Sequence, residues 1–129
     1  MIIQRAYKTK LRVNNVQRAT LNRCAGAARY VYNWALADRI ARYEAGNPTN
    51  YYEQKKRFNA LKDELCPWIR EVPYTVMESA FRNLDAAYKN FFRRVKQGAE
   101  KPGFPKFKAK GKSTKTFTVR GVAIEHDAI

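Results

Sequence analysis

Cationic and aromatic side chains alternate in the segment from Lys89 to Lys115. This segment holds ten lysines and arginines against one acid, Glu100. Around Phe104 and Phe107 the basic residues alternate with Phe, Pro and Gly and do not form a plain lysine run. Because successive side chains of a strand point to opposite faces, this pattern predicts phenylalanines on one face and lysines on the other. We interpret the segment as a folded surface that holds a phosphate backbone.

Residues that could carry catalysis or bind a metal are sparse. The one histidine, His126, precedes an aspartate, but neither Ser79 nor Ser113 has the local sequence of a nucleophile. The eleven carboxylates mostly lie among cations, as Asp38 does beside Arg39, so we interpret them as surface ion pairs. They do not assemble into a two-metal site, zinc ligands are too few, and no glycine-rich phosphate loop occurs. We therefore predict no catalytic residue, no metal site and no cofactor in this chain.

The charge of the chain predicts an anionic partner. Its 129 residues suit one domain, and 45% hydrophobic residues suffice for a modest core. The net charge of +15 destabilises a compact monomer unless a polyanion offsets it. Nucleic acid is the leading candidate and an anionic membrane surface the second, but no apolar run could span a bilayer.

The isolated Cys24 and Cys66 indicate free, buried thiols in a reducing cytoplasm, with a disulfide between them as the alternative.

Hydrophobic periodicity predicts a helical block between strands. Mixed alternation over 2–13 is typical of a strand, and Asn14 is suited to cap the helix that follows. The predicted helices cover 16–45, 52–65 and the stretch from Pro73 to Gly98, and period-two alternation returns from Phe104. This order predicts an α+β fold, in which a small β-barrel carries a helical insertion. Three segments are expected: 1–13, 14–99 and 100–129.

Three motifs, taken together, resemble a known family. The first runs from Leu11 into the sequence RYVYNW at 29–34, the second from Val72-Pro73 into AFRNLDAAYKNFF at 80–92, and the third is GFPKFK at 103–108. In this order they resemble the N-terminal part of TnpB (OrfB) proteins of bacterial insertion sequences, over essentially the whole chain. The resemblance implies an RNA-guided DNA endonuclease related to type V CRISPR effectors, with a transposon-end RNA as its guide.

The resemblance also implies a domain layout. Residues 1–13 would form the first strand of a wedge barrel, 14–99 a helical recognition lobe, and 100–129 a basic return with further wedge strands. The RuvC-like nuclease domain of the family, with its divalent metal, and the zinc ribbon would lie beyond Ile129. We therefore expect a non-catalytic chain: a truncated product, a fragment, or one half of a split protein.

Individual site residues follow from the same motifs. The residues that would meet the DNA motif beside the target are Tyr52, Tyr74, Thr75, Glu78 and Thr118. Glu78 departs from the amide expected there, and a carboxylate accepts from cytosine N4 but cannot donate, so a different motif preference follows. The residues that would contact phosphates of guide RNA or heteroduplex are Arg5, Lys8, Lys10, Arg29, Arg93, Arg94, Lys96, Lys106 and Lys108.

The function predicted from the sequence is a module that binds guide RNA and target DNA. It would act in the bacterial cytoplasm, at the nucleoid when bound to DNA, and without contact to a membrane. One alternative is a stand-alone DNA-binding regulator that places a helix in a groove. Another is the non-catalytic half of a split nuclease, active with a separate nuclease-bearing chain. A non-functional remnant is the last.

Overall fold

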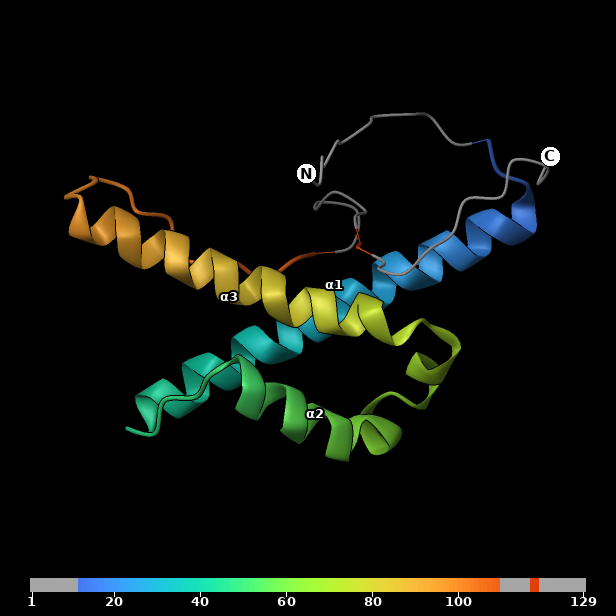
Figure 1. The fold of residues 1–129 in the computed structure, drawn as a ribbon, viewed down its shortest axis with the longest axis horizontal. Helices are drawn as coiled ribbons and strands as arrows, with labels where there is room; N and C mark the ends of the chain where they lie inside the picture. The colour runs from blue at the N-terminus through green and yellow to red at the C-terminus, as the bar shows by residue number, and fades with distance from the viewer. Residues whose placement is uncertain (1–11, 110–116, 119–129) are drawn as a thin grey trace, which may run out of the picture.

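Three α-helices make up most of the described chain, which comprises residues 12–109 and 117–118 of a computed structural model. Helices α1 and α3 cross while running in the same general direction, and α2 runs back the other way (Figure 1). The helices predicted from periodicity are confirmed. Their bounds are Asn15–Glu44 for α1, Tyr51–Leu65 for α2, Pro67–Glu71 for the short 3₁₀ helix η1, and Tyr74–Lys96 for α3.

Local side-chain chemistry sets the helix ends. The Asn14 side chain accepts the N–H of Gln17 at 2.8 Å, and the Gln17 side chain accepts the N–H of Asn14 at 3.0 Å. This reciprocal capping box satisfies two backbone donors at the start of α1. Asn50 caps α2 by accepting the N–H of Glu53 at 3.0 Å. Past the end of α1, Gly46 takes a φ of 76°, the left-handed conformation that ends many helices.

The core lies where the three helices meet. Phe58 of α2 and Phe81 of α3 are fully buried with ring centroids 5.6 Å apart, and Trp34 of α1 packs against both. Leu36 and Leu84 are also fully buried beside them. Edge-on aromatic pairs of this kind contribute beyond the area they bury. Each helix therefore supplies a large side chain to one shared cluster.

The apolar stripes predicted from the sequence are longer than the parts of the helices that are buried. Val16, where the predicted stripe of α1 begins, is exposed, and burial on this helix starts at Cys24. On α2, Phe58 is buried as predicted, whereas Leu61 and Leu65 are exposed. Within the described residues, the helices meet over only part of their length, so spacing alone overestimates the core.

A polar network also joins the helices. Arg39 of α1 donates to Gln54 of α2 at 2.9 Å and to Asp85 of α3 at 3.0 Å. Asp38 accepts from Arg42 and from Arg57 of α2. These side chains are largely shielded from solvent. The interpretation of Asp38 as a surface ion pair with the adjacent Arg39 is therefore wrong: Asp38 pairs with Arg42 one turn later on α1 and with Arg57 of α2, and Arg39 pairs with Asp85 of α3.

The predicted α+β fold is also wrong. Residues 12–109 and 117–118 contain helices and no strand. The stretch from Phe104 to Lys108 follows α3 and lies against α3 and α1, through the ring of Phe104 and the backbone of Lys108. Pro105 has no N–H to give to a sheet and is buried here. The remaining predicted strand residues lie outside the described ones, in 1–11, 110–116 and 119–129, and the segment boundaries at 13 and 99 stay a prediction.

The predicted two-faced alternation fails within the same stretch. Phe104 and Phe107 are three positions apart, so a period of two places them on opposite faces. Phe104 packs against Tyr88 and Phe91 with centroids 5.6 and 5.3 Å away and is still 44% exposed, and Phe107 is 55% exposed. The phenylalanines therefore do not form one anchored face.

Cys24 and Cys66 are free and buried, as predicted. Burial raises the pKa of both thiols, which disfavours the reactive thiolate. None of the described helices is both long enough and apolar enough to cross a bilayer.

Candidate nucleic-acid interface

Glu78 lies between two cations on the surface shared by α2 and α3. Its carboxylate accepts from Lys55 Nζ at 3.5 Å and from Arg82 Nη2 at 3.1 Å. Lys55 comes from α2, whereas Arg82 lies one helical turn after Glu78 on α3. One acid thus holds two cationic side chains of different helices in place. We call this surface, made of Tyr51, Tyr52, Lys55, Tyr74, Glu78 and Arg82, the α2–α3 face.

Three tyrosine rings border these charges. Lys55 Nζ lies 5.7 Å from the ring centroids of both Tyr51 and Tyr74. Arg82 stands over the Tyr51 ring at 5.7 Å, and Tyr52 meets Tyr51 edge-on at 5.1 Å. Cations within about 6 Å of an aromatic face are attracted by its quadrupole. The face therefore offers flat rings and positive charge together, which are the groups that contact bases and phosphates.

Ionisation on this face favours charged side chains. Burial acts to raise the pKa of Glu78, but Lys55 and Arg82 outweigh it and hold that pKa below its ordinary value. Burial acts to lower the pKa of Lys55, and the neighbouring tyrosines and Glu78 outweigh it in the opposite direction. Both groups are therefore charged at neutral pH.

The segment after α3 is held against the helices at several points. Arg94 Nη1 donates to the carbonyl of Pro102 at 2.6 Å. Gly103 has a φ of 73°, and a Cβ there would come within 3.2 Å of the Arg94 guanidinium. Phe104 then packs on α3, and buried Pro105 follows. We call residues 101–109 the basic strap.

Asn33 of α1 fastens the far end of the basic strap. Its Nδ2 donates to the carbonyl of Lys108, and its Oδ1 accepts the N–H of Lys108, both at 2.8 Å. The Lys108 ammonium lies over the ring of Tyr32 at 4.4 Å. The strap therefore bridges α3 and α1.

Two relatives and one family model match this sequence. Residues 1–48 match the model of the OrfB helix-turn-helix domain. Over 127 residues the chain is 31% identical to "Putative RNA-guided DNA endonuclease InsQ" of Escherichia coli (strain K12), covering 95% of this chain. Over 113 residues it is 30% identical to "Putative RNA-guided DNA endonuclease" of Streptomyces pristinaespiralis, covering 86% of this chain.

The chain is a relative of these OrfB-type proteins. The resemblance seen in the motifs is thereby confirmed. The matches span 29% and 27% of the lengths of the two relatives, so this chain corresponds to less than a third of each. The described part of the range matched by the helix-turn-helix model, residues 12–48, holds the single helix α1.

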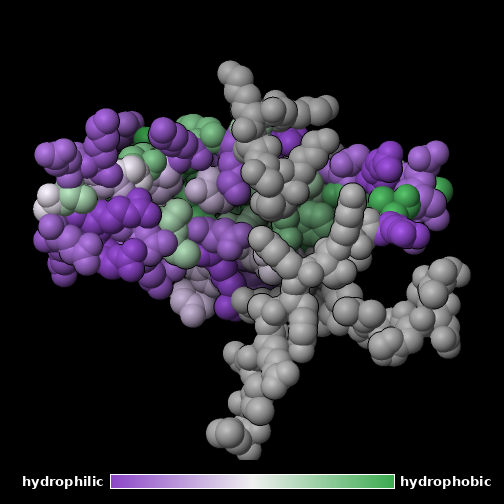
Figure 2. Space-filling view, turned by 90° about the horizontal axis from the view of Figure 1, so that it is seen from above, coloured by the Kyte–Doolittle hydropathy of each residue, from purple (hydrophilic) through white to green (hydrophobic). Residues whose placement is uncertain are grey.

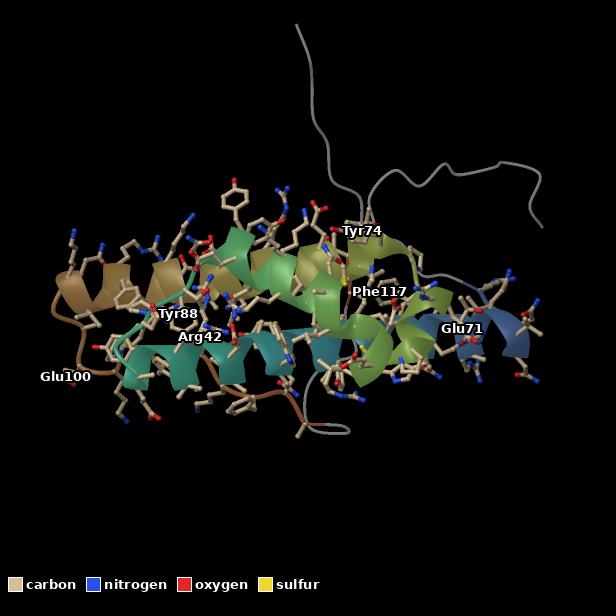
Figure 3. The ribbon with its side chains drawn as sticks, turned by 90° about the horizontal axis from the view of Figure 1, so that it is seen from below. Arg42, Glu71, Tyr74, Tyr88, Glu100 and Phe117 are labelled. Atoms are coloured by element: carbon tan, nitrogen blue, oxygen red, sulfur yellow. The ribbon has the colours of Figure 1, made fainter. Side chains whose placement is uncertain are left out.

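The structure brings most of the predicted DNA-contact positions of this OrfB relative to one region. Tyr52 and Tyr74 are exposed, and Glu78 links their two helices through Lys55. Thr75 is half-buried in the first turn of α3. Thr118 is exposed and follows Phe117, which packs against a cluster formed by residues of α1 and of the start of α3. Figure 3 labels Phe117 and Tyr74. Nothing in this geometry tests contact with DNA, so these roles stay predictions.

The residues predicted to contact phosphate differ in their surroundings: some are exposed to solvent, and others interact with groups of the protein itself. Arg93, Lys96 and Lys106 are exposed, whereas Arg29 is half-buried on α1. Arg94 and Lys108 serve the basic strap, through the Pro102 carbonyl and the Tyr32 ring. The end of the molecule where α3 finishes is covered mainly by hydrophilic residues (Figure 2). The positions outside the described residues are Arg5, Lys8 and Lys10.

Sequence reasoning missed several residues of this region. Lys55 and Arg82 were counted among the cationic residues that could meet nucleic acid, but they were not assigned to the DNA-contact positions. Lys55 follows Tyr52 by three positions and Arg82 follows Glu78 by four, which are the spacings of helical neighbours. Asn33 carries no such signal, because its partner Lys108 is 75 positions away. Among the described residues, no group of three or more His, Cys, Asp or Glu side chains is placed to hold a metal.

Proposed function

We propose that this chain is the nucleic-acid-binding module of an RNA-guided DNA endonuclease, and that it holds guide RNA and target DNA. The names of both relatives support an RNA-guided DNA endonuclease. The net charge of +15 supports a polyanionic partner. The observation that carries the proposal is the α2–α3 face, where exposed tyrosines and paired cations meet on two helices.

In this proposal the two groups of residues have different tasks. The α2–α3 face meets the duplex beside the target, through Tyr52, Tyr74, Thr75 and Glu78, with Thr118 nearby. The cations of α1, α3 and the basic strap hold the phosphates of the guide or heteroduplex. Phosphate contacts position the ligand without reading its sequence, while base contacts specify it.

A binding experiment with RNA tests this function. The 129-residue chain is titrated with the transposon-end RNA of its own element and with an unrelated RNA of equal length, across about 50–200 mM salt. We expect tighter binding of the transposon-end RNA and a steep loss of affinity as salt rises. Equal affinity for both RNAs, or affinity that does not change with salt, would refute the proposal.

A second function, a stand-alone DNA-binding regulator, is favoured by the helix-turn-helix family model over residues 1–48. It predicts sequence-specific binding of duplex DNA with no RNA present. A recognition helix in a groove is normally preceded by a turn and a supporting helix. Within the described residues 12–48 of the matched range, there is one continuous helix, α1. Selection of bound duplexes from a random pool, with and without RNA, separates the two functions.

The chain's length relative to its relatives bears on catalysis. The 129 residues span less than a third of each relative, and in this proposal they contribute binding. In the test, a nuclease region is supplied as a separate chain and would carry the metal-dependent cleavage. Target cleavage on mixing the two chains with guide RNA, and no cleavage by either alone, is the expected result. Cleavage by this chain alone would contradict the assignment.

A further inference from the structure

The basic strap is anchored on both sides of one exposed lysine. Before Lys106, Phe104 packs against two aromatic rings of α3, and Pro105 is buried. After it, Lys108 is fastened to Asn33. Lys106 itself is exposed between these anchors. Its backbone is therefore fixed by its neighbours while its ammonium group remains open to solvent.

The side-chain carboxamide of Asn33 bonds to the Lys108 backbone as a backbone peptide group of a neighbouring strand would. A carboxamide presents one N–H donor side and one C=O acceptor, and Asn33 uses both on the N–H and C=O of the same residue. The two distances are equal, 2.8 Å each. In a sheet, a neighbouring strand would make this pair of bonds. Here, a side chain of α1 takes the place of that strand and holds the backbone of Lys108.

Fixing the strap before binding reduces the cost of binding. Ordering the backbone of one residue costs about 1–2 kcal/mol of conformational entropy. A strap that is already ordered does not lose this entropy when a phosphate binds, and preorganised groups therefore bind more tightly. A lysine on a loose segment would make the same charge contact with a smaller gain.

We propose that Asn33 is a positioning residue for phosphate binding, and that it acts by holding the basic strap so that Lys106 faces the nucleic-acid backbone. This inference deepens the proposed function and depends on it. Asn33 does not touch the ligand in this scheme. Its effect on affinity passes through the strap to Lys106.

A double-mutant cycle between Asn33 and Lys106 tests the inference. The probe is a fluorescein-labelled transposon-end RNA, and the variants of the whole chain are Asn33→Ala, Lys106→Ala and both together. In the wild-type background Lys106→Ala weakens binding about tenfold or more, the fold-change that corresponds to one charge-assisted hydrogen bond. In the Asn33→Ala background it weakens binding less than about twofold, because the lysine is no longer held in place.

Limited trypsin digestion gives an independent readout of the strap. Asn33→Ala accelerates cleavage after Lys106 and Lys108 about tenfold or more, because cleavage requires local release of the backbone. Asn22→Ala, at an exposed asparagine of the same helix, changes neither cleavage nor binding. Asn33→Asp keeps the acceptor for the Lys108 N–H but loses the donor, and gives intermediate cleavage. It serves as the test variant if the alanine variant folds poorly.

Each outcome decides the inference. Faster cleavage together with a diminished Lys106 effect supports it. Faster cleavage would overturn the positioning role of Asn33 if Lys106→Ala weakened binding as much in the Asn33→Ala background as in wild type. Asn33 would then hold the strap without any effect on affinity. Unchanged cleavage overturns the clamp itself. If wild-type protein fails to prefer the transposon-end RNA, the proposed function falls and positioning with it, while the cleavage result still shows whether Asn33 holds the strap.

Discussion

Arg39 of α1 donates through Nε to the side-chain oxygen of Gln54 of α2 at 2.9 Å, although Gln54 is only 1% exposed. The Gln54 amide nitrogen in turn donates to the Ala35 carbonyl at 2.7 Å and to Asp38 at 3.1 Å. The buried amide is therefore bonded at both its oxygen and its nitrogen, as burial of a polar group requires. Through Asp85, the same guanidinium also reaches α3.

Replacing Gln54 by alanine is expected to lower the free energy of unfolding by about 2–3 kcal/mol. The change leaves Arg39 Nε without its acceptor in a shielded position and removes one donor from Asp38, and unsatisfied buried groups carry the full desolvation cost. Urea unfolding followed by far-UV circular dichroism measures the effect. The control is Asn83→Ala, at an exposed position of α3, which should change stability by less than about 0.5 kcal/mol. Equal free energies of unfolding for the two variants would contradict a stabilising role for the hydrogen bonds of Gln54.

The same network predicts a loss of stability in acid. Burial acts to raise the pKa of Asp38, but hydrogen bonds from Arg57, Arg42 and Gln54 outweigh it and hold the pKa below its ordinary 3.8. A carboxyl with a depressed folded pKa contributes stability above its unfolded pKa, and this is lost as pH falls through the folded value. Stability is therefore expected to fall below about pH 4. In Asp38→Asn, urea midpoints measured against pH should fall less steeply on the acid side, and an unaltered slope argues against this assignment.

The helices could be predicted from sequence because their signals are local. The capping residue Asn14 precedes α1, Gly46 follows it, and the apolar spacing of Phe81 and Leu84 identifies the core side of α3. Each signal needs only neighbours within a turn or two of the chain. Element type and approximate bounds were therefore accessible without tertiary information.

The basic strap and the interhelical network could not be predicted in the same way. Period-two alternation around Lys106 is equally compatible with a strand and with an extended segment held by side chains. The partner that decides between them, Asn33, lies far away in the sequence and has no distinctive spacing. The charge pairing of Asp38 also depends on which helices pack together, so proximity in the sequence to Arg39 suggested the wrong partner. For the candidate interface, the charge pattern indicated the basic residues around Lys106 and the family resemblance indicated the positions for DNA contact; both stay predictions.

Tyr52 provides a direct test of the α2–α3 face in binding. Its side chain is 78% exposed, so Tyr52→Ala should change the free energy of unfolding by less than about 0.5 kcal/mol. We expect affinity for a guide RNA–target DNA complex to fall by about 1–3 kcal/mol, the usual value of one base–aromatic contact. Tyr43→Ala is the matched control, since Tyr43 is 75% exposed near the end of α1. An equal loss in both variants would show that exposed tyrosines contribute without regard to position.

Glu78 should limit how tightly the α2–α3 face binds phosphate. Its carboxylate engages Lys55 and Arg82, so it lowers the positive charge available to a ligand and repels phosphate itself. In Glu78→Gln the amide keeps the size of the side chain but frees both cations. We therefore expect tighter binding of unrelated duplex DNA and a salt dependence steeper by about one phosphate contact. Binding is measured by fluorescence anisotropy across a salt series.

The control for this experiment is Glu64→Gln, which removes the same charge from an exposed position on α2. Both variants raise the net charge by the same amount. The comparison therefore isolates the effect of releasing Lys55 and Arg82 from Glu78. A larger gain for Glu78→Gln supports neutralisation of the two cations by Glu78. Weaker binding would instead indicate that the carboxylate accepts a hydrogen bond from a base, such as cytosine N4. Comparing duplexes that differ at a single base pair would then identify that base, because loss of the acceptor removes discrimination at one position and leaves the others unchanged.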